Sequence, residues 1–224
     1  MIEIIPTCVP LEEYDIESSI SIVTHFSKYL HIDIDDGVFV PFETWPYIAP
    51  LATSITPFDT RYVSLEVHLM VQFPTELGVQ LGKAGVRRLI VHAEILPNLT
   101  VFQEMCASWR LAHIESVGIA ILSDTSLQII EDFKNDIDFV QIMSVSRIGE
   151  QGALFNSLAL DRVAYVRAKY PHLCIVVDGG ITIDNIKDLV KAGATRFCVG
   201  KALMQQTDPQ YAYTTLLAKA NSAL

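Results

Sequence analysis

Two histidines and two aspartates, His31, Asp33, His68 and Asp178, lie in or directly after short hydrophobic runs of the sequence. Imidazole nitrogens and carboxylate oxygens are suitable ligands for one divalent metal ion. Asp178 follows a strongly apolar run, and a carboxylate there is costly to bury unless it is paired or bound to a metal. These residues favour a metal-dependent enzyme, and the alternative is that they form ordinary buried hydrogen bonds.

The spacing of these residues predicts where they lie. His31 and Asp33 are two positions apart, so in a strand their side chains point to the same face. His68 and Asp178 stand at the corresponding ends of two other runs. In a parallel (β/α) barrel the carboxyl ends of all strands meet at one face, which carries the active site. We therefore expect all four side chains at one mouth of such a barrel.

Strand-like and helix-like segments alternate along the chain. Runs rich in Val and Ile predict strands over Glu3–Pro6, Tyr29–Ile34, Val63–Met70, Arg88–His92, Ser116–Ile121, Phe139–Ser144, Leu173–Val177 and Arg196–Gly200. Helical patterns cover Leu11–Ser27, Pro74–Ala84, Leu99–Leu111, Thr125–Phe133, Leu158–Lys169, Ile183–Ala192 and Lys201–Ala223. The segment Pro41–Ile55 holds three prolines, so we expect only a short helix there.

The repeated pattern predicts the fold class. Lys-Ala-Gly occurs at 83–85 and 191–193, each time before a predicted strand. Lysine complements the helix dipole, and glycine accepts the left-handed conformation that ends many helices. Eight such units predict an α/β protein, a single (β/α)8 TIM barrel with a parallel eight-stranded sheet, as one domain over residues 1–224. A doubly wound open sheet is the alternative, but no G-x-G-x-x-G follows the first strand.

Composition narrows the class of partner and the compartment. Acidic residues outnumber basic ones by 26 to 16, which argues against a nucleic-acid or anionic-membrane partner. An anionic small substrate remains compatible, because backbone amides can bind phosphate on an acidic protein. The four cysteines form no C-x-x-C pair, and we see no signal peptide and no apolar run long enough to span a membrane. We expect a cytoplasmic protein with reduced cysteines.

Five short motifs resemble those of the ribulose-phosphate 3-epimerase family. Residues 31–41 (HIDIDDGVFVP) resemble its H-x-D-x-M-D-G-x-F-V-P signature, and 66–71 (EVHLMV) its D-x-H-L-M-V. Residues 91–94 (VHAE), 143–145 (MSV) and 177–181 (VDGGI) resemble V-H-x-E, M-S-V and V-D-G-G-I. The order and approximate spacing agree from Pro6 to Leu203.

The resemblance implies a specific site and reaction. In that family two His and two Asp hold one divalent metal, which maps here to His31, Asp33, His68 and Asp178. It implies that Asp33 and Asp178 are the catalytic pair, one on each face of the sugar carbon, and that they exchange a proton at C3 through a cis-enediolate. The physics agrees, because a metal on the C2 and C3 oxygens would stabilise the developing charge. The donor set suits Zn, Mn, Fe or Co.

Substrate-binding residues follow from the same resemblance. Phosphate recognition is expected at Gly179, Gly180, Gly200 and Lys201, where glycine lets the backbone approach the anion closely. Thr7 resembles a substrate-side serine of the family, and Met70 and Met143 resemble methionines that lie beside its substrate. The resemblance also implies that His68 lies beside the substrate. Simple turn chemistry for the glycines, and core filling for the methionines, are the alternatives.

Three features of the sequence depart from the family pattern. Asp35 stands where the family has an apolar Met, on the same face as Asp33. The N-P-G-F-G-G-Q lid reads SRIGEQG at 146–152, so Arg147 and Gly149 belong to a possible lid, and Arg147 either grips the phosphate or lies in solvent. Lys201 replaces a serine, as part of the phosphate site or as an exposed residue.

These departures leave several functions open. The leading one is 3-epimerisation of a phosphorylated ketose, most simply D-ribulose 5-phosphate to D-xylulose 5-phosphate. A six-carbon substrate such as allulose 6-phosphate is an alternative, as is a non-catalytic sugar-phosphate-binding protein. A decarboxylase or aldolase resembling the orotidylate decarboxylases would need a D-x-K-x-x-D motif, and residues 33–36 contain no Lys. We expect a phosphorylated ketose as partner and a homo-oligomer, as is frequent among such barrels.

Overall fold

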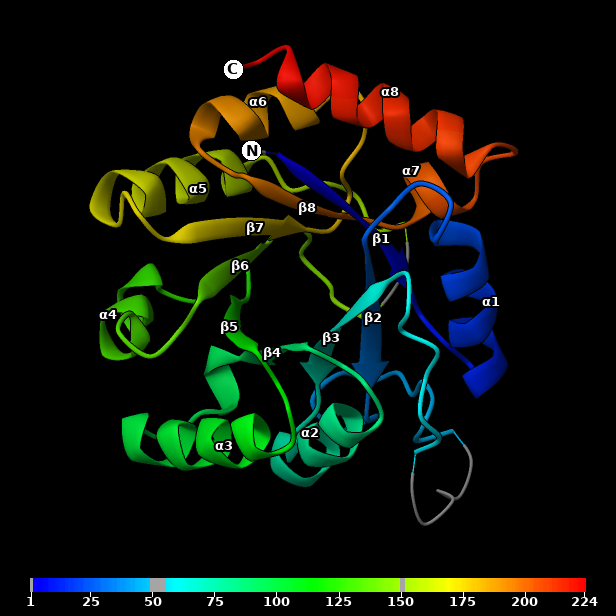
Figure 1. The fold of residues 1–224 in the computed structure, drawn as a ribbon. Helices are drawn as coiled ribbons and strands as arrows, with labels where there is room; N and C mark the ends of the chain where they lie inside the picture. The colour runs from blue at the N-terminus through cyan, green and yellow to red at the C-terminus, as the bar shows by residue number, and fades with distance from the viewer. Residues whose placement is uncertain (1, 49–54, 150–151) are drawn as a thin grey trace.

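The computed structural model describes residues 2–48, 55–149 and 152–224, and its centre is a closed barrel of eight parallel strands. The strands are β1 (Glu3–Cys8), β2 (Tyr29–Asp35), β3 (Ser64–Met70), β4 (Arg88–His92), β5 (Ser116–Ile121), β6 (Phe139–Met143), β7 (Cys174–Asp178) and β8 (Arg196–Val199). Each pairs with its neighbour in sequence, and β8 closes the ring on β1. Figure 1 looks along this barrel, with the helices outside it. The (β/α)8 prediction is confirmed, and each predicted strand is present with ends shifted by at most two residues.

The helices cover the outside of the barrel. They are α1 (Glu13–Val23), α2 (Pro74–Lys83), α3 (Leu99–Leu111), α4 (Ile130–Phe133), α5 (Leu158–Lys169), α6 (Ile186–Ala192), α7 (Lys201–Met204) and α8 (Pro209–Asn221), with short 3₁₀ turns η1 (Ala93–Ile95) and η2 (Leu127–Ile129). The expected glycine stops are present, since Gly85 and Gly193 have φ of 110° and 116°. No described helix is long and apolar enough to cross a membrane.

Two helix predictions were wrong. The predicted helix over Lys201–Ala223 is divided into α7 and α8, because Asp208 caps a new helix that starts at Pro209. The helix expected within Pro41–Ile55 is absent from its described residues, which form turns around Trp45 and Pro46. Residues 49–54 of that segment lie outside the described part of the chain.

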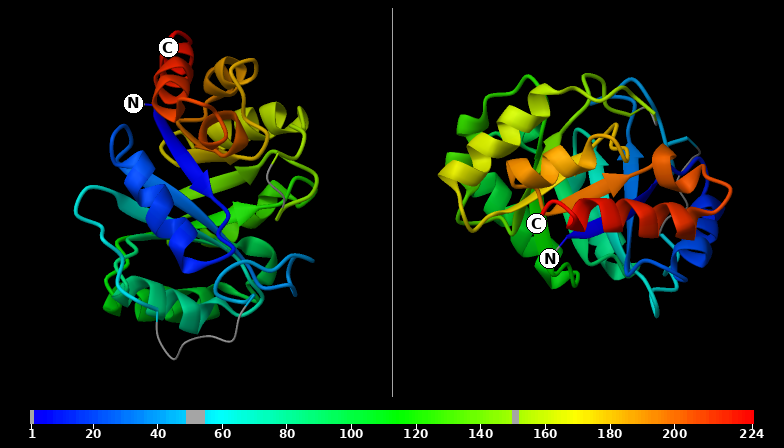
Figure 2. Two further views of the ribbon diagram at one scale, coloured as in Figure 1. Left: turned by 90° about the vertical axis from the view of Figure 1, so that its right-hand side faces the viewer. Right: turned by 90° about the horizontal axis from the view of Figure 1, so that it is seen from above.

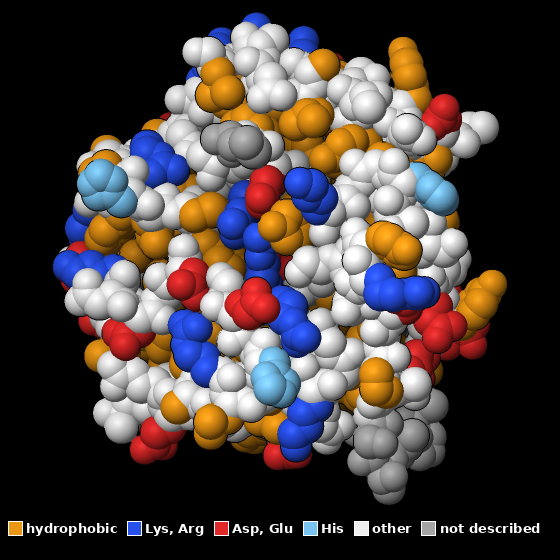
Figure 3. Space-filling view, viewed as in Figure 1, with side chains coloured by type: hydrophobic (Ala, Val, Ile, Leu, Met, Phe, Trp, Pro, Cys, Tyr) orange, Lys and Arg blue, Asp and Glu red, His pale blue; other side chains and the backbone are white. Residues whose placement is uncertain are grey.

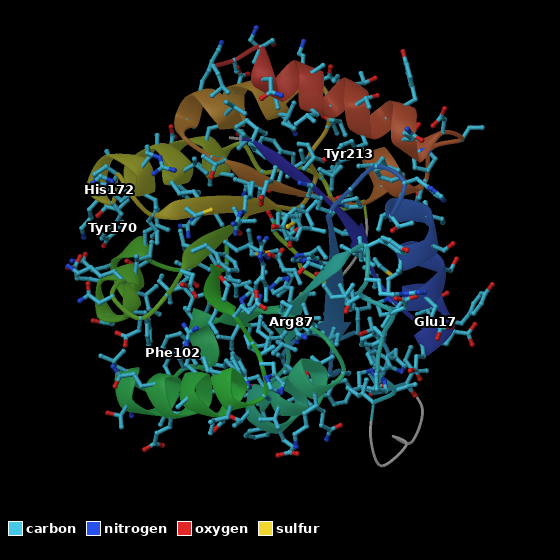
Figure 4. The ribbon with its side chains drawn as sticks, in the orientation of Figure 1. Glu17, Arg87, Phe102, Tyr170, His172 and Tyr213 are labelled. Carbon is cyan, nitrogen blue, oxygen red and sulfur yellow. The ribbon has the colours of Figure 1, made fainter. Side chains whose placement is uncertain are left out.

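The core has two layers. Outward-facing strand residues such as Leu30, Ile32 and Ile34 pack against the helices. Neighbouring helices also touch one another, as where Phe102 of α3, labelled in Figure 4, meets the Phe133 ring at 5.2 Å. A smaller cluster fills the barrel itself, and Gly118 leaves room there for the Phe139 ring, which a Cβ would approach to 2.3 Å.

One end of the barrel is closed by charged side chains. Figure 2 (left) shows the strands running the same way, and Figure 3, seen from their amino ends, shows acidic and basic side chains near the middle of that face. Inside this end, Arg196 Nε lies 2.7 Å from Glu3 Oε2, and Arg88 lies 3.6 Å from the buried Glu66. The cavity described next therefore opens at the carboxyl ends of the strands.

Candidate functional site

A cavity of about 490 Å³ opens at the carboxyl ends of the strands. Most of the site residues expected from the sequence line it: Thr7, Asp33, Met70, Met143, Gly149, Asp178, Gly179, Gly180, Gly200 and Lys201. His31 and His68 lie behind Asp33 and are fully buried. Arg147 is exposed and is not one of the lining residues, which favours the alternative that it lies in solvent.

The four proposed metal ligands form one cluster. One ligand atom from each of His31, Asp33, His68 and Asp178 lies within 4.8 Å of all the others. Asp33 Oδ1 is 3.2 Å from His31 Nε2 and 3.2 Å from His68 Nδ1, and Asp178 Oδ2 is 3.6 Å from the same His68 nitrogen. Ligands bound at ~2.0–2.2 Å from one ion lie roughly 3–3.5 Å from each other, so the arrangement fits a single divalent ion.

Strand register explains why these residues meet. His31 and Asp33 alternate with outward-facing Leu30, Ile32 and Ile34 along β2, so both point into the barrel. Asp33 pairs with His68 across the β2–β3 ladder. Asp178, the last residue of β7, completes the group from the other side.

Gln141 of β6 holds two members of the cluster, and sequence reasoning assigned it no role. Its side-chain nitrogen donates to Asp178 Oδ2 at 3.0 Å and lies 3.2 Å from His68 Nδ1. The available signal was a polar residue inside a fully buried strand, two positions before Met143, where an unpaired amide is costly.

A second set of buried groups lies behind His31. Its Nδ1 is 2.8 Å from Glu66 Oε1 and 3.4 Å from Cys198 Sγ. Burial opposes ionisation of Glu66, but His31 and the nearby Arg88 and Arg196 hold its pKa below the usual value. The Glu66 carboxylate therefore accepts a hydrogen bond from Nδ1 of His31 and orients its ring, so that Nε2 of His31 faces Asp33.

The carboxylates and the imidazoles of the cluster stabilise each other's charged forms. Burial alone would raise the pKa of Asp33, but the charge and hydrogen bonds of His31 and His68 hold it well below its usual range. Burial opposes protonation of His68, but Asp178 and Asp33 raise its pKa. The deeper His92 is different, since burial lowers its pKa to about 4.

Asp35 is an anomaly beside this cluster. It pairs with Met70 in the β2–β3 ladder, is fully buried, and neither carboxylate oxygen has a hydrogen-bond partner among the described residues. Burial, followed by the charge of Asp33, raises its pKa to about 7. The expectation that Asp35 lies on the same face as Asp33 is consistent with the strand register, although it does not line the cavity.

The far end of the cavity is built from loops. Gly179 and Gly180 have φ of 108° and 62°, and Ser144 Oγ donates to the carbonyl of Gly179 at 2.6 Å. Asn185 donates to the Gly180 carbonyl at 2.9 Å, so the turn is held from both sides. Lys201 lies against Gly152 of the segment after β6, with Cδ 3.1 Å from where a Cβ would stand.

Several known proteins are similar to this chain in sequence or in fold. The sequence profile described as the Ribulose-phosphate 3 epimerase family matches residues 3–204. The ribulose-phosphate 3-epimerase of Bacillus subtilis is 30% identical over 193 residues, covering 84% of each chain. That of Chlamydia muridarum is 34% identical over 176 residues, covering 75% of this chain and 72% of its own.

Solved structures of low sequence identity share the fold. The KGPDC of Streptococcus mutans superposes with a TM-score of 0.72 at 7% identity, covering 99% of this chain and 98% of its own. The 3-hexulose-6-phosphate synthase of Salmonella typhimurium gives 0.69 at 12% identity over the whole of both chains. At such identities the likeness concerns the barrel alone.

Proposed function

Because the chain belongs to the ribulose-phosphate 3-epimerase family, we propose that it is a metal-dependent 3-epimerase that interconverts D-ribulose 5-phosphate and D-xylulose 5-phosphate. The observation that carries the proposal is the pair Asp33 and Asp178. They come from β2 and β7, both face the cavity, and both belong to the cluster with His31 and His68.

His31, Asp33, His68 and Asp178 would hold one divalent ion, chosen from Zn, Mn, Fe or Co. When bound there, such an ion stabilises negative charge on the C2 and C3 oxygens of the sugar and so makes the C3 proton more acidic. The site supports this role because its two imidazoles and two carboxylates are the nitrogen and oxygen donors that these ions prefer.

The two carboxylates perform the proton transfer. One carboxylate takes the proton from C3, the C–H electron pair forms the C2–C3 double bond, and the C2 carbonyl oxygen takes the negative charge. The other residue, starting as a carboxylic acid, gives its proton to C3 from the opposite face while the carbonyl reforms. Configuration at C3 is inverted, no atom is gained or lost, and the two aspartates exchange roles when the reaction runs backwards.

The rest of the cavity fits a phosphorylated ketose. The Gly179–Gly180 turn, Gly200 and Lys201 lie together on its wall and would bind the phosphate through backbone amides and the ammonium group. Thr7 would donate to or accept from a substrate hydroxyl, while Met70 and Met143 supply apolar surface near the carbon chain. Gly149, in the segment after β6, would help cover the substrate.

Isotope exchange tests this function. The metal-loaded protein is incubated with D-ribulose 5-phosphate in deuterated water, and the substrate and product are examined by NMR. We expect deuterium at C3 and formation of D-xylulose 5-phosphate. A parallel incubation with allulose 6-phosphate reports whether a six-carbon ketose is preferred. Absence of C3 exchange with both substrates would falsify epimerisation.

A further inference from the structure

A chain of hydrogen bonds leads from the four proposed metal ligands to β4. His68 Nε2 lies 2.9 Å from Nε2 of His92, the last residue of β4. His92 Nδ1 lies 3.1 Å from Glu94 Oε2 in η1. The other Glu94 oxygen, Oε1, accepts a hydrogen bond from the backbone N–H of Leu122 at 2.8 Å. Both imidazoles are fully buried.

The position of each proton follows from counting donors and acceptors. A carboxylate only accepts, so the Glu94 oxygen at 3.1 Å calls for a proton on His92 Nδ1. A neutral His92 then has a lone pair on Nε2, which can accept only if His68 Nε2 carries a proton. With its Nε2 protonated, His68 is left with Nδ1 as the nitrogen able to offer a lone pair.

His68 Nδ1 is the atom that faces the proposed ion. It lies 3.2 Å from Asp33 Oδ1 and 3.6 Å from Asp178 Oδ2. The side-chain nitrogen of Gln141 lies 3.2 Å from the same atom while it donates to Asp178. An amide N–H beside Nδ1 is compatible with a lone pair there once an ion neutralises the two carboxylates, which would otherwise hold a proton on the same atom.

We propose that Glu94, acting through His92, fixes the tautomer of His68 so that its Nδ1 lone pair points at the metal. Glu94 and His92 are thus positioning residues, and this role rests on the proposed metal site. The chain is longer than the usual arrangement, in which a ligand histidine donates directly to a carboxylate or carbonyl. His31 has that shorter form, through Glu66.

The variant Glu94→Gln tests the proposal because it changes the number of acceptors without changing the shape. Two N–H groups, from Leu122 and His92, point at the two Glu94 oxygens, whereas a glutamine has one oxygen and one NH₂ group. If the NH₂ faces His92, both imidazoles must move their protons, and His68 Nδ1 becomes a donor. We expect zinc to bind 10–100-fold more weakly, as for other changes behind a metal ligand.

Two measurements are made on the full chain. Zinc affinity is obtained by competition with a chromophoric chelator, for the wild type, Glu94→Gln and the control Glu104→Gln, which removes an exposed carboxylate from α3. The protonated nitrogen of each imidazole is read from long-range ¹H–¹⁵N NMR spectra. We expect protons on His92 Nδ1 and His68 Nε2 in the zinc-loaded wild type, changed positions in Glu94→Gln, and wild-type affinity in Glu104→Gln.

The outcomes separate this inference from the proposed function. A wild type that binds no zinc contradicts both. Zinc binding by the wild type, together with unchanged affinity in Glu94→Gln, overturns the role of Glu94 and leaves the epimerase assignment intact. A zinc-loaded wild type with the His92 proton on Nε2 also overturns it, and this spectrum decides the question if Glu94→Gln does not fold.

Discussion

Asp33 and Asp178 have different surroundings although they share one cluster. Asp33 Oδ1 lies between two imidazole nitrogens, each at 3.2 Å. Asp178 Oδ2 instead accepts from the amide of Gln141, and its backbone carbonyl accepts from Ser144. Asp33 thus contacts both imidazoles, whereas Asp178 lies 3.6 Å from His68 and is held by Gln141 and Ser144.

Replacing Asp178 by asparagine should abolish turnover without unfolding the protein. The amide keeps the shape and one oxygen but cannot take up a proton, so we expect the C3 exchange rate to fall at least 10²–10⁴-fold, the usual contribution of a general acid or base. Far-ultraviolet circular dichroism checks the fold. The control Asp184→Asn, at an exposed position in the same β7–α6 connection, should exchange at the wild-type rate. A near-native rate in Asp178→Asn removes it from the acid/base pair.

Removing the charge of Asp35 should stabilise the metal-free protein at alkaline pH. Its pKa is raised to about 7, so the folded state binds this proton more tightly than the unfolded chain, where the value is about 3.9. Stability from this group is therefore present below about pH 4 and is lost as the pH rises to about 7. The free energy of unfolding of Asp35→Asn, relative to that of the wild type, should therefore rise by roughly 1–3 kcal/mol as the pH is raised from 5 to 8.

Urea unfolding at pH 5 and at pH 8 measures the stability difference between Asp35→Asn and the wild type, with the exposed Asp132→Asn as the control. A pH-independent difference between Asp35→Asn and the wild type means that Asp35 finds a partner in solution.

The sequence indicated the proposed metal ligands more clearly than the groups behind them. His31, Asp33, His68 and Asp178 stand out because charged residues inside or directly after apolar runs are unusual. Gln141 is equally unusual in a buried strand, but the sequence does not say which groups its amide meets, and thiols such as that of Cys198 are common there. Their roles depend on contacts between β6, β7 and β8, which only the closed barrel brings together.

At the scale of elements, the β7–α6 turn would position the proposed phosphate. Gly180 has φ of 62°, and a Cβ there would stand 2.6 Å from the backbone nitrogen of Phe155. The clash is with backbone, so the turn itself must move. We expect Gly180→Ala to raise KM for the sugar phosphate by tenfold or more, because the backbone amides of the turn would no longer align with the anion.

Steady-state kinetics measures this effect, and Gly85→Ala is the matched control. Gly85 also has a positive φ, of 110°, but precedes β4 and lies outside the cavity lining. Strain of about 1 kcal/mol should lower the melting temperature of Gly85→Ala and leave KM unchanged. Equal KM values for the two variants argue against a phosphate at this turn.

The errors in the predicted elements have local causes. The pattern from Lys201 to Ala223 is helical throughout, but the side chain of Asp208 accepts from the backbone N–H of Tyr211 and starts a second helix. A residue that can cap a new helix competes with continuation of the existing helix through it. Which of the two forms depends here on how the segment packs against β1 and α6. The connection after β2 has no helix in its described residues, although a short one was expected within Pro41–Ile55.

For the whole molecule, a bound ion would tie together distant parts of the barrel. Its proposed ligands come from the paired strands β2 and β3 and from β7, which β8 and β1 separate from β2, so the metal would cross-link strands that do not pair with one another. Zinc at about 100 times its dissociation constant should stabilise the fold by about 2.7 kcal/mol. For a chain of 224 residues this raises the melting temperature by roughly 5–10 °C.

Differential scanning fluorimetry with zinc and with a chelator measures this shift. His68→Asn should lose most of it, whereas His172→Asn should keep it, because His172 is exposed and lies at the periphery of the barrel, as Figure 4 shows. Identical shifts in the two variants place the stabilising ion elsewhere. The predicted homo-oligomer and cytoplasmic location remain predictions from the sequence.

One measurement tests directly whether a metal ion binds between the four side chains. Crystals of the wild-type protein grown with manganese or zinc can be measured on both sides of the metal's absorption edge. We predict one strong anomalous peak within about 2.0–2.3 Å of His31 Nε2, His68 Nδ1 and an oxygen of each aspartate. Four side chains bonded only to one another, with no peak between them in metal-saturated crystals, would contradict it.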